Sequence, residues 1–267
     1  MALELTWVPL VLAGLAAGLL AGLFGVGGGV VVVPAVYAVL VAAGLPAALA
    51  VKLALGTSLA SIVFTGSVSA WRHQRRGAVE WQVVAALAPG LIIGAGTAGA
   101  IAHLAPGEAL RTGFALFLLL VAARMLQRYE LVRDAARELP PAVALLAVGL
   151  VFGVISGLAG VGGGALVVPF LLWSGLTMTM AVGTAAASGI AIAVAGSIGY
   201  LLSGWSVPEL PEYAIGYIYL PALAAVVLGS MVAVPVGVWA AHRLPPRPLQ
   251  LAFAAMIVVF AGAMLMH

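Results

Sequence analysis

The chain has 267 residues, of which 64% are hydrophobic and 7% charged, and it carries a formal net charge of +3. This composition excludes a soluble fold, because most of the residues cannot face water. The absence of cysteine excludes disulfides, thiolate metal sites and thiol chemistry. Apolar stretches of about 20 residues recur without strand-like alternation, which is typical of membrane helices rather than of barrel strands. The sequence therefore predicts an all-α polytopic membrane protein.

In chain order, the first half is predicted to hold a helical hairpin followed by three membrane-spanning helices. The Lys-free and Arg-free N-terminal residues ahead of the first apolar run differ from a secretory signal, so we expect a retained first helix. The predicted first repeat covers residues 1–128, with the hairpin over 5–43 and helices over 47–70, 81–102 and 108–127. A polar cytoplasmic linker is expected over 129–139.

The second half repeats this order of elements. It covers residues 140–267, with a hairpin over 140–175 and helices over 177–202, 213–241 and 248–266. The cluster "GVGGG" begins at Gly25 and again at Gly160, 135 positions further, each time with a proline five residues after its last glycine. Three further pairs of segments match across the halves: "LGTSLAS" at 55–61 with "VGTAAAS" at 182–188, Ala102-His103 with Ala241-His242, and Pro106 with Pro245. These matches predict one ancestral unit used twice.

The charged loops predict how the two units lie in the membrane. The segments "WRHQRRGAVE", "RMLQRYELVRDAARE" and "HRLPPRP" are basic, whereas "SGWSVPELPE" has two Glu and no Lys or Arg. The positive-inside rule puts the first three in the cytoplasm and the last outside. Because each unit then makes an odd number of net crossings, the second is inverted relative to the first. We expect both termini outside a prokaryotic cytoplasmic membrane, as in many transporters built from inverted repeats. The basic residues report this orientation, and no nucleic-acid partner is expected.

The two glycine clusters are predicted to form half-sites for an anion at the tips of the hairpins. A helix break inside a membrane must be buried in protein or line a wet cavity. Glycine lets the backbone adopt positive φ and approach a ligand closely. The helix that follows each cluster presents free N–H groups and the positive end of its dipole. The competing interpretation is tight helix packing, which "GLIIGAGTAG" at 90–99 illustrates.

The ionisable residues also favour an anion. All eight acids lie in loops or at segment ends, so no buried carboxylate is available for hydrolysis, cation coordination or proton relay. Lys52 is a cation inside a span; it is expected either to attract the anion or to snorkel to the outer interface. The hydroxyls of the central helices are candidate donors, with bonding to their own helix backbone as the alternative. His103 and His242 are interpreted as interfacial caps. The predicted substrate-binding residues are Gly27, Gly28, Gly29, Lys52, Thr57, Ser58, Ser61, Gly162, Gly163, Gly164, Thr184 and Ser188.

These motifs resemble the TauE/SafE-type sulfite exporter family. The resemblance rests on the paired glycine clusters, each followed by a proline, and on the Gly56-Thr57-Ser58 and Gly183-Thr184-Ala185 runs, and it covers nearly the whole chain. It implies transport of sulfite or of small organic sulfonates and carboxylates, usually outward. Ala185 departs from Ser58, so the two half-sites need not contribute equally.

From the residues and the resemblance together we expect a secondary transporter that works by alternating access and binds a small anion. No catalytic residues, metal ligands or cofactors are expected, and the only other partner is the lipid bilayer. A passive anion channel is the first alternative. A non-transporting membrane subunit or an intramembrane enzyme is the second.

Overall fold

The computed structural model describes residues 4–25, 27–126, 140–241, 243 and 246–266. Within these residues the fold consists of ten α-helices and one short β-hairpin. The first half contains α1 (Glu4–Phe24), α2 (Gly29–Ala42), α3 (Ala47–Gln74), α4 (Trp81–Leu104) and α5 (Gly107–Leu126). The second half contains α6 (Ala142–Leu158), α7 (Gly164–Trp173), α8 (Met178–Gly204), α9 (Leu220–Ala241) and α10 (Pro246–Met266).

Five of these helices are long and apolar enough to cross a membrane, namely α1, α3, α4, α8 and α9. Together with the helical content, they confirm the predicted all-α polytopic membrane protein. The expected linker over 129–139 lies outside the described residues. Whether the two hairpins cross fully, and whether the second half is inverted in the membrane, stay predictions.

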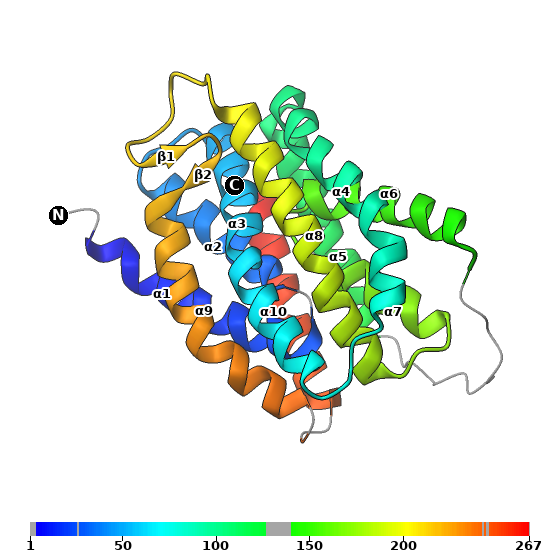
Figure 1. The fold of residues 1–267 in the computed structure, drawn as a ribbon. Helices are drawn as coiled ribbons and strands as arrows, with labels where there is room; N and C mark the ends of the chain where they lie inside the picture. Colours follow the sequence, from blue (N-terminus) through cyan, green and yellow to red (C-terminus); the bar gives the residue numbers. More distant parts are fainter. Residues whose placement is uncertain (1–3, 26, 127–139, 242, 244–245, 267) are drawn as a thin grey trace.

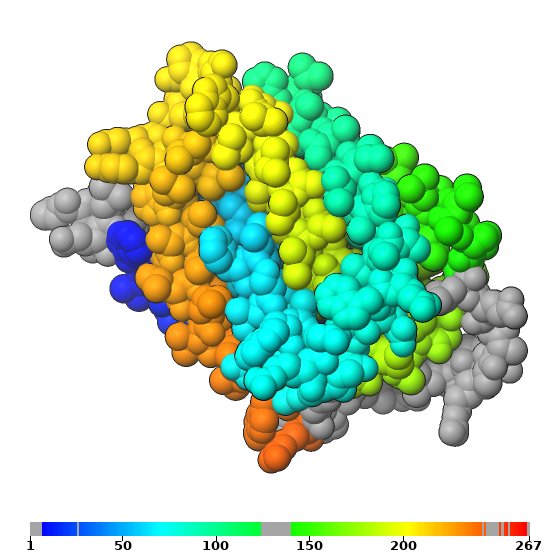
Figure 2. Space-filling model, viewed as in Figure 1, coloured from blue at the N-terminus to red at the C-terminus, as the bar shows by residue number. Residues whose placement is uncertain are grey.

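The most extensive helix pairs join the two halves. The longest helices, α3 and α8, lie side by side, and Figure 2 shows α3 as a blue-to-cyan strip between orange α9 and yellow α8. Around them α1 packs along α9, α4 along α6 and α5 along α10 (Figure 1). The pairs α1–α9 and α4–α6 are equivalent, since each joins the first helix of one half to the fourth helix of the other.

Glycines allow these two equivalent pairs to pack closely. Added methyl groups at Gly18 of α1 and Gly94 of α4 would overlap the backbone of Ser230 in α9 and Leu150 in α6, respectively. Small residues at such positions let membrane helices approach until their backbones touch. For these glycines, the packing interpretation is therefore the one that the structure supports.

One segment differs from the predicted helices. Residues 213–219 were expected to begin the helix over 213–241, but they form a β-hairpin in which Ala214–Ile215 (β1) pairs antiparallel with Ile218–Tyr219 (β2). Tyr213 has φ 66° and Gly216 has φ 55°, and an α-helix cannot continue through two such residues. The helix α9 accordingly starts at Leu220.

Candidate anion site between the two glycine tips

The two glycine clusters form short buried turns that join α1 to α2 and α6 to α7. In the first tip, Gly25, Gly27 and Gly28 have φ of 65°, 73° and 79°, which is the region that glycine enters without steric cost. In the second tip Gly160 has φ 61°, whereas Gly163 has φ −58°. The two tips therefore share a sequence pattern without sharing one backbone conformation.

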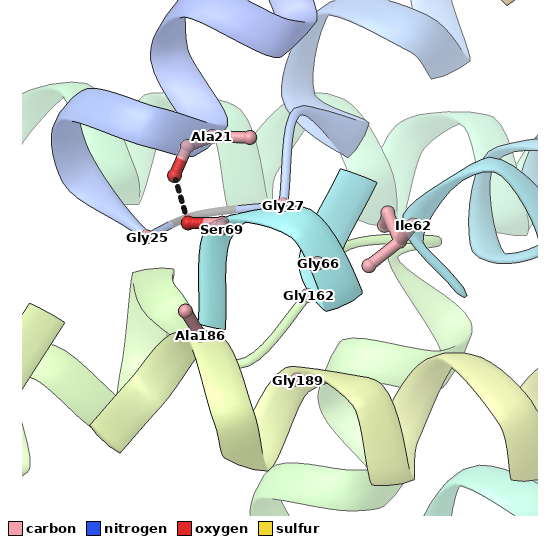
Figure 3. Close-up of a pocket in the computed structure, with 9 residues that line it drawn as sticks. All are labelled: Ala21, Gly25, Gly27, Ile62, Gly66, Ser69, Gly162, Ala186 and Gly189. Carbon is pink, nitrogen blue, oxygen red and sulfur yellow. Dashed lines mark hydrogen bonds between the residues drawn. The ribbon is translucent and has the colours of Figure 1, made fainter. Parts of the chain in front are cut away.

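The tips touch each other in the interior of the protein. A methyl group added at Gly27 would lie 3.2 Å from Gly162 Cα, and one added at Gly29 would overlap Gly160 O. Figure 3 shows Gly25 and Gly27 of the first tip and Gly162 of the second, with parts of α3 and α8 next to them. The structure therefore brings residues of the two predicted half-sites together.

Each tip also packs against the central helix of the other half. An added methyl group at Gly25 would lie 2.7 Å from Val182 O in α8, and one at Gly160 would lie 3.1 Å from Leu55 Cα in α3. Val182 and Leu55 are matching positions in the two "GT" segments, 127 residues apart. The reciprocal contacts mean that movement of either half changes the environment of both tips.

Hydroxyl groups of α3 satisfy carbonyl groups at and near the tips. Ser58 Oγ donates to Gly160 O at 2.6 Å, Thr65 Oγ1 lies 3.4 Å from Gly27 O, and Ser69 Oγ donates to Ala21 O at 3.2 Å. These hydroxyls act as donors, so the tip carbonyls of Gly160 and Gly27 accept their hydrogen bonds.

The N–H groups of the tips are not satisfied in the same way. Among the described residues, those of Gly27–Gly29 and Gly162–Gly164 donate no hydrogen bond, and neither Gly28 nor Gly163 offers a side-chain cap to the helix that follows. All six glycines are buried. Buried helix N-termini without partners are unusual, and two of them side by side create a region of positive potential.

The two predicted threonines hold backbone from the opposite half instead of facing a tip carbonyl. Thr57 Oγ1 accepts a hydrogen bond from Tyr219 N at 2.9 Å, and Thr184 Oγ1 accepts one from Glu80 N at 3.0 Å. Added methyl groups at the neighbouring Gly56 and Gly183 would overlap Tyr217 O and Ala78 O. Each Gly-Thr pair therefore seats the segment that precedes α9 or α4.

The remaining predicted serines occupy different environments. Ser61 Oγ donates to Ser58 O in its own helix at 2.7 Å. Ser188 Oγ is fully buried without a hydrogen-bond partner among the described residues. Its neighbour Gly189 faces the second tip, since an added methyl group there would lie 3.3 Å from Gly163 N.

Lys52 lies toward the other end of α3, about 9 Å along the helix from Ser58. Its ammonium group donates to His103 O at 2.8 Å, near the C-terminus of α4, and stands 5.9 Å from the centre of the Tyr217 ring. The Tyr217 hydroxyl is 2.9 Å from His103 Nδ1. Burial raises the pKa of Tyr217, so the hydroxyl is protonated at neutral pH and can donate to His103. A cation at a helix C-terminus is favourable; His242, the matching residue, lies outside the described part of the chain.

A narrow crevice runs alongside the tips, and of its lining residues only Gly27 and Gly162 were predicted from the sequence. It is lined by Ala21, Gly25, Gly27, Ile62, Gly66, Ser69, Gly162, Ala186 and Gly189 (Figure 3). In this conformation it leaves no room for a water molecule. The spacing of Ser61, Thr65 and Ser69 at four-residue intervals was the available signal, because it places three hydroxyls on one helix face. No cluster of metal-ligating side chains occurs within the described ranges.

Comparison with known proteins adds to this geometry. The model of the family described as "Sulfite exporter TauE/SafE" matches residues 10–264. A probable membrane transporter protein of Haemophilus influenzae is 36% identical over 250 residues, covering 94% of each chain. Probable membrane transporter proteins of Bacillus subtilis and Methanocaldococcus jannaschii are 30% and 25% identical, covering 94% and 96% of this chain and 97% and 94% of their own. No solved structure matches. These names indicate a membrane transporter rather than an enzyme.

Proposed function

The chain belongs to the sulfite exporter TauE/SafE family, and from this premise we propose that it is a secondary transporter of sulfite or of a small organic sulfonate or carboxylate. Transport is outward across the cytoplasmic membrane of a prokaryotic cell. The anion binds between the two glycine tips and is exposed to each side of the membrane in turn.

The observation that carries this proposal is the polarity of the tips. Their N–H groups donate no hydrogen bonds among the described residues, while hydroxyls of α3 donate to the carbonyls of Gly160 and Gly27. Two helix N-termini of about half a positive charge each favour an anion. With the acids confined to loops and segment ends, no carboxylate inside a span opposes it.

In this proposal the ligand is held mainly by backbone. The N–H groups of Gly27–Gly29 and Gly162–Gly164 are the main donors, because a sulfite or sulfonate group has three oxygens that accept hydrogen bonds from several directions. The Ser188 hydroxyl, which has no partner among the described residues, adds a further donor. Ser58 and Ser61 sit behind the tips, and Thr57 and Thr184 keep the surrounding segments in place. Lys52 attracts anions to the outer end of the pathway.

Alternating access is supported by the way the tips pack. Gly25 lies against Val182 of α8 and Gly160 against Leu55 of α3, so movement of one half relative to the other would change the contacts of both tips. Rocking of one half against the other would separate the tips and release the ligand, as in other transporters with repeated units.

Counterflow in proteoliposomes tests the proposal. Vesicles loaded with unlabelled sulfite should accumulate external ³⁵S-sulfite transiently and saturably, and small sulfonates and carboxylates should compete in proportion to their affinity. A passive channel would instead give conductance without counterflow. Absence of both would contradict transport of these anions.

A matched pair of serine variants tests the site itself. Ser188→Ala removes a buried hydroxyl that makes no hydrogen bond to the described residues, so the fold should keep its stability. Loss of a hydrogen bond to a charged ligand should raise the KM for sulfite by about tenfold or more. Ser230→Ala is the control, because Ser230 is equally buried but its hydroxyl bonds only Val227 O in its own helix. Equal KM values in the two variants would remove Ser188 from the site.

A further inference from the structure

The crevice beside the tips follows α3. At its inner end are Gly27 and Gly162 of the two tips, and it continues along α3 past Gly66 to Ser69, with Ala21 of α1 and Ala186 of α8 as the facing walls (Figure 3). This direction leads toward the end of α3 that carries Arg72 and Arg75, which the positive-inside rule assigns to the cytoplasm.

The matching region on the other side of the tips is filled. Leu59 and Ile62 of α3 match Ala186 and Gly189 of α8, since the two helices correspond at an offset of 127 residues. Leu59 is fully buried, and its Cδ1 atom would lie 2.9 Å from a methyl group added at Gly196, the position that matches Ser69. Because Ile62 itself lines the crevice, the difference between the two sides rests on Ala186 of α8, where α3 carries the larger Leu59.

The two sides also differ in polar character at two of three matching positions; at the third, Tyr200 of α8 carries a buried hydroxyl. Thr65, Ser69 and His73 follow one another at four-residue intervals on one face of α3, and each is only 1% exposed. The matching positions on α8 are Ile192, Gly196 and Tyr200. Buried polar residues on one face of a membrane helix commonly line a cavity or a pathway for polar solutes.

Resting on the proposed function, we propose that this crevice is the cytoplasmic half of the anion pathway and that residues 186 and 59 set how tightly the two halves close. The small Ala186 lets the cytoplasmic half open by separation of α3 from α8, with Ser69 in its wall. Leu59 is the corresponding plug of the outer half.

The absence of native cysteine makes a direct test possible, because each introduced thiol is the only one in the chain. Ser69→Cys should react with a membrane-impermeant methanethiosulfonate reagent applied from the cytoplasmic side of inside-out vesicles. Ser67→Cys is the matched control: Ser67 lies two residues away on the same helix, but it is exposed on the apolar outer surface. Although Ser69 is buried and Ser67 is exposed, the thiol of the Ser69→Cys variant should react about tenfold faster, because a thiol ionises in water and not in lipid.

Replacement of Ala186 by leucine in the Ser69→Cys background gives the second arm. The added side chain fills the crevice in the way that Leu59 fills the outer half. Both the modification of the introduced thiol and the counterflow of sulfite should therefore fall by about tenfold or more. Ala186→Val is the smaller step if the leucine variant is not recovered from the membrane. Leu59→Ala should have no such effect on modification from the cytoplasmic side.

The outcomes separate this inference from the proposed function. If the Ser69→Cys thiol reacts no faster than the Ser67→Cys thiol while counterflow persists, the crevice is not the pathway. The proposed transport function would then still be supported. Fast modification of Ser69→Cys that is suppressed by Ala186→Leu, without counterflow of any tested anion, would support the aqueous pathway and contradict the proposed substrates.

Discussion

At the scale of single residues, the Gly-Thr runs show how far a sequence motif can be interpreted. Their pairing across the halves could be predicted from the sequence, whereas their partners could not. Thr57 accepts from Tyr219 N, which is 162 residues away, and Thr184 accepts from Glu80 N. No local sequence pattern predicts such a contact, because the contact depends on how the two halves pack. Glu80 and Tyr219 are themselves 139 positions apart, the offset that also relates His103 to His242.

We predict that these two bonds stabilise the fold. Thr57→Val and Thr184→Val keep the shape of the side chain but leave a part-buried backbone N–H without its partner, which should cost about 1 kcal/mol each. Thr97→Val is the control, because the exposed Thr97 hydroxyl bonds only Gly94 O in its own helix. The midpoint of thermal unfolding in detergent is the measurement. If all three variants unfold at the same temperature, the Gly-Thr runs do not hold the two halves together.

The glycines of the tips are equivalent in the sequence but not in the structure. Gly28 has φ 79°, and an added methyl group would lie 2.7 Å from Ala17 O. The matching Gly163 has φ −58°, and its nearest neighbour would be Val167 Cγ2 at 3.1 Å. The repeat predicted the positions of both residues, but a repeat does not determine which copy adopts the left-handed conformation.

Alanine at these two positions should therefore have different effects. Gly28→Ala combines backbone overlap with a left-handed conformation that alone costs about 1–2 kcal/mol, so little folded protein is expected. Gly163→Ala should fold, with altered transport. Size-exclusion chromatography of the detergent-solubilised protein gives the folded fraction, and counterflow gives the activity. Equal folded fractions would mean that the two tips are conformationally alike.

At the scale of elements, hydropathy placed the long helices well and missed the segment before α9. The observed α3 (Ala47–Gln74) and α4 (Trp81–Leu104) match the predicted 47–70 and 81–102 closely, because basic and aromatic residues mark where each apolar run ends. The hairpin at 214–219 is apolar as well, so hydropathy merged it with the following helix. Its strand pairing is set by the turn at Gly216 and by contact with α3 and α8, neither of which hydropathy reports.

Close packing between helices gives the element-scale prediction. Methyl groups at Gly90 and Gly94 of α4 would overlap the backbone of α6, whereas one at Gly113 of α5 would meet nothing within 4 Å. Gly90→Ala and Gly94→Ala should therefore lower the unfolding temperature by separating the pair. Gly113→Ala should raise stability by about 0.5–1 kcal/mol, because alanine is the better helix former. A stabilising effect of alanine at position 94 would contradict the close α4–α6 contact.

At the scale of the whole molecule, the two halves exchange equivalent contacts throughout. The first helix of each half packs on the fourth helix of the other, each tip packs on the other half's central helix, and each Gly-Thr run seats the other half's loop. Such reciprocity is expected of two copies related by an approximate two-fold axis. The charge pattern predicts that this axis lies in the membrane plane, because the positive-inside rule places equivalent loops on opposite sides.

The inversion can be tested at the first residues of the two central helices. Ala47 is the first residue of α3, Met178 is the first residue of the equivalent helix α8, and both side chains are exposed. In the cysteine-free chain, Ala47→Cys should react with an impermeant thiol reagent applied from outside the cell, and Met178→Cys only from the cytoplasmic side. The reason is that an odd number of net crossings separates a loop from its copy in the second unit, so equivalent ends of the two helices face opposite compartments. Labelling of both from one side would require the halves to be parallel, and the tips could then no longer serve as gates to opposite sides of the membrane.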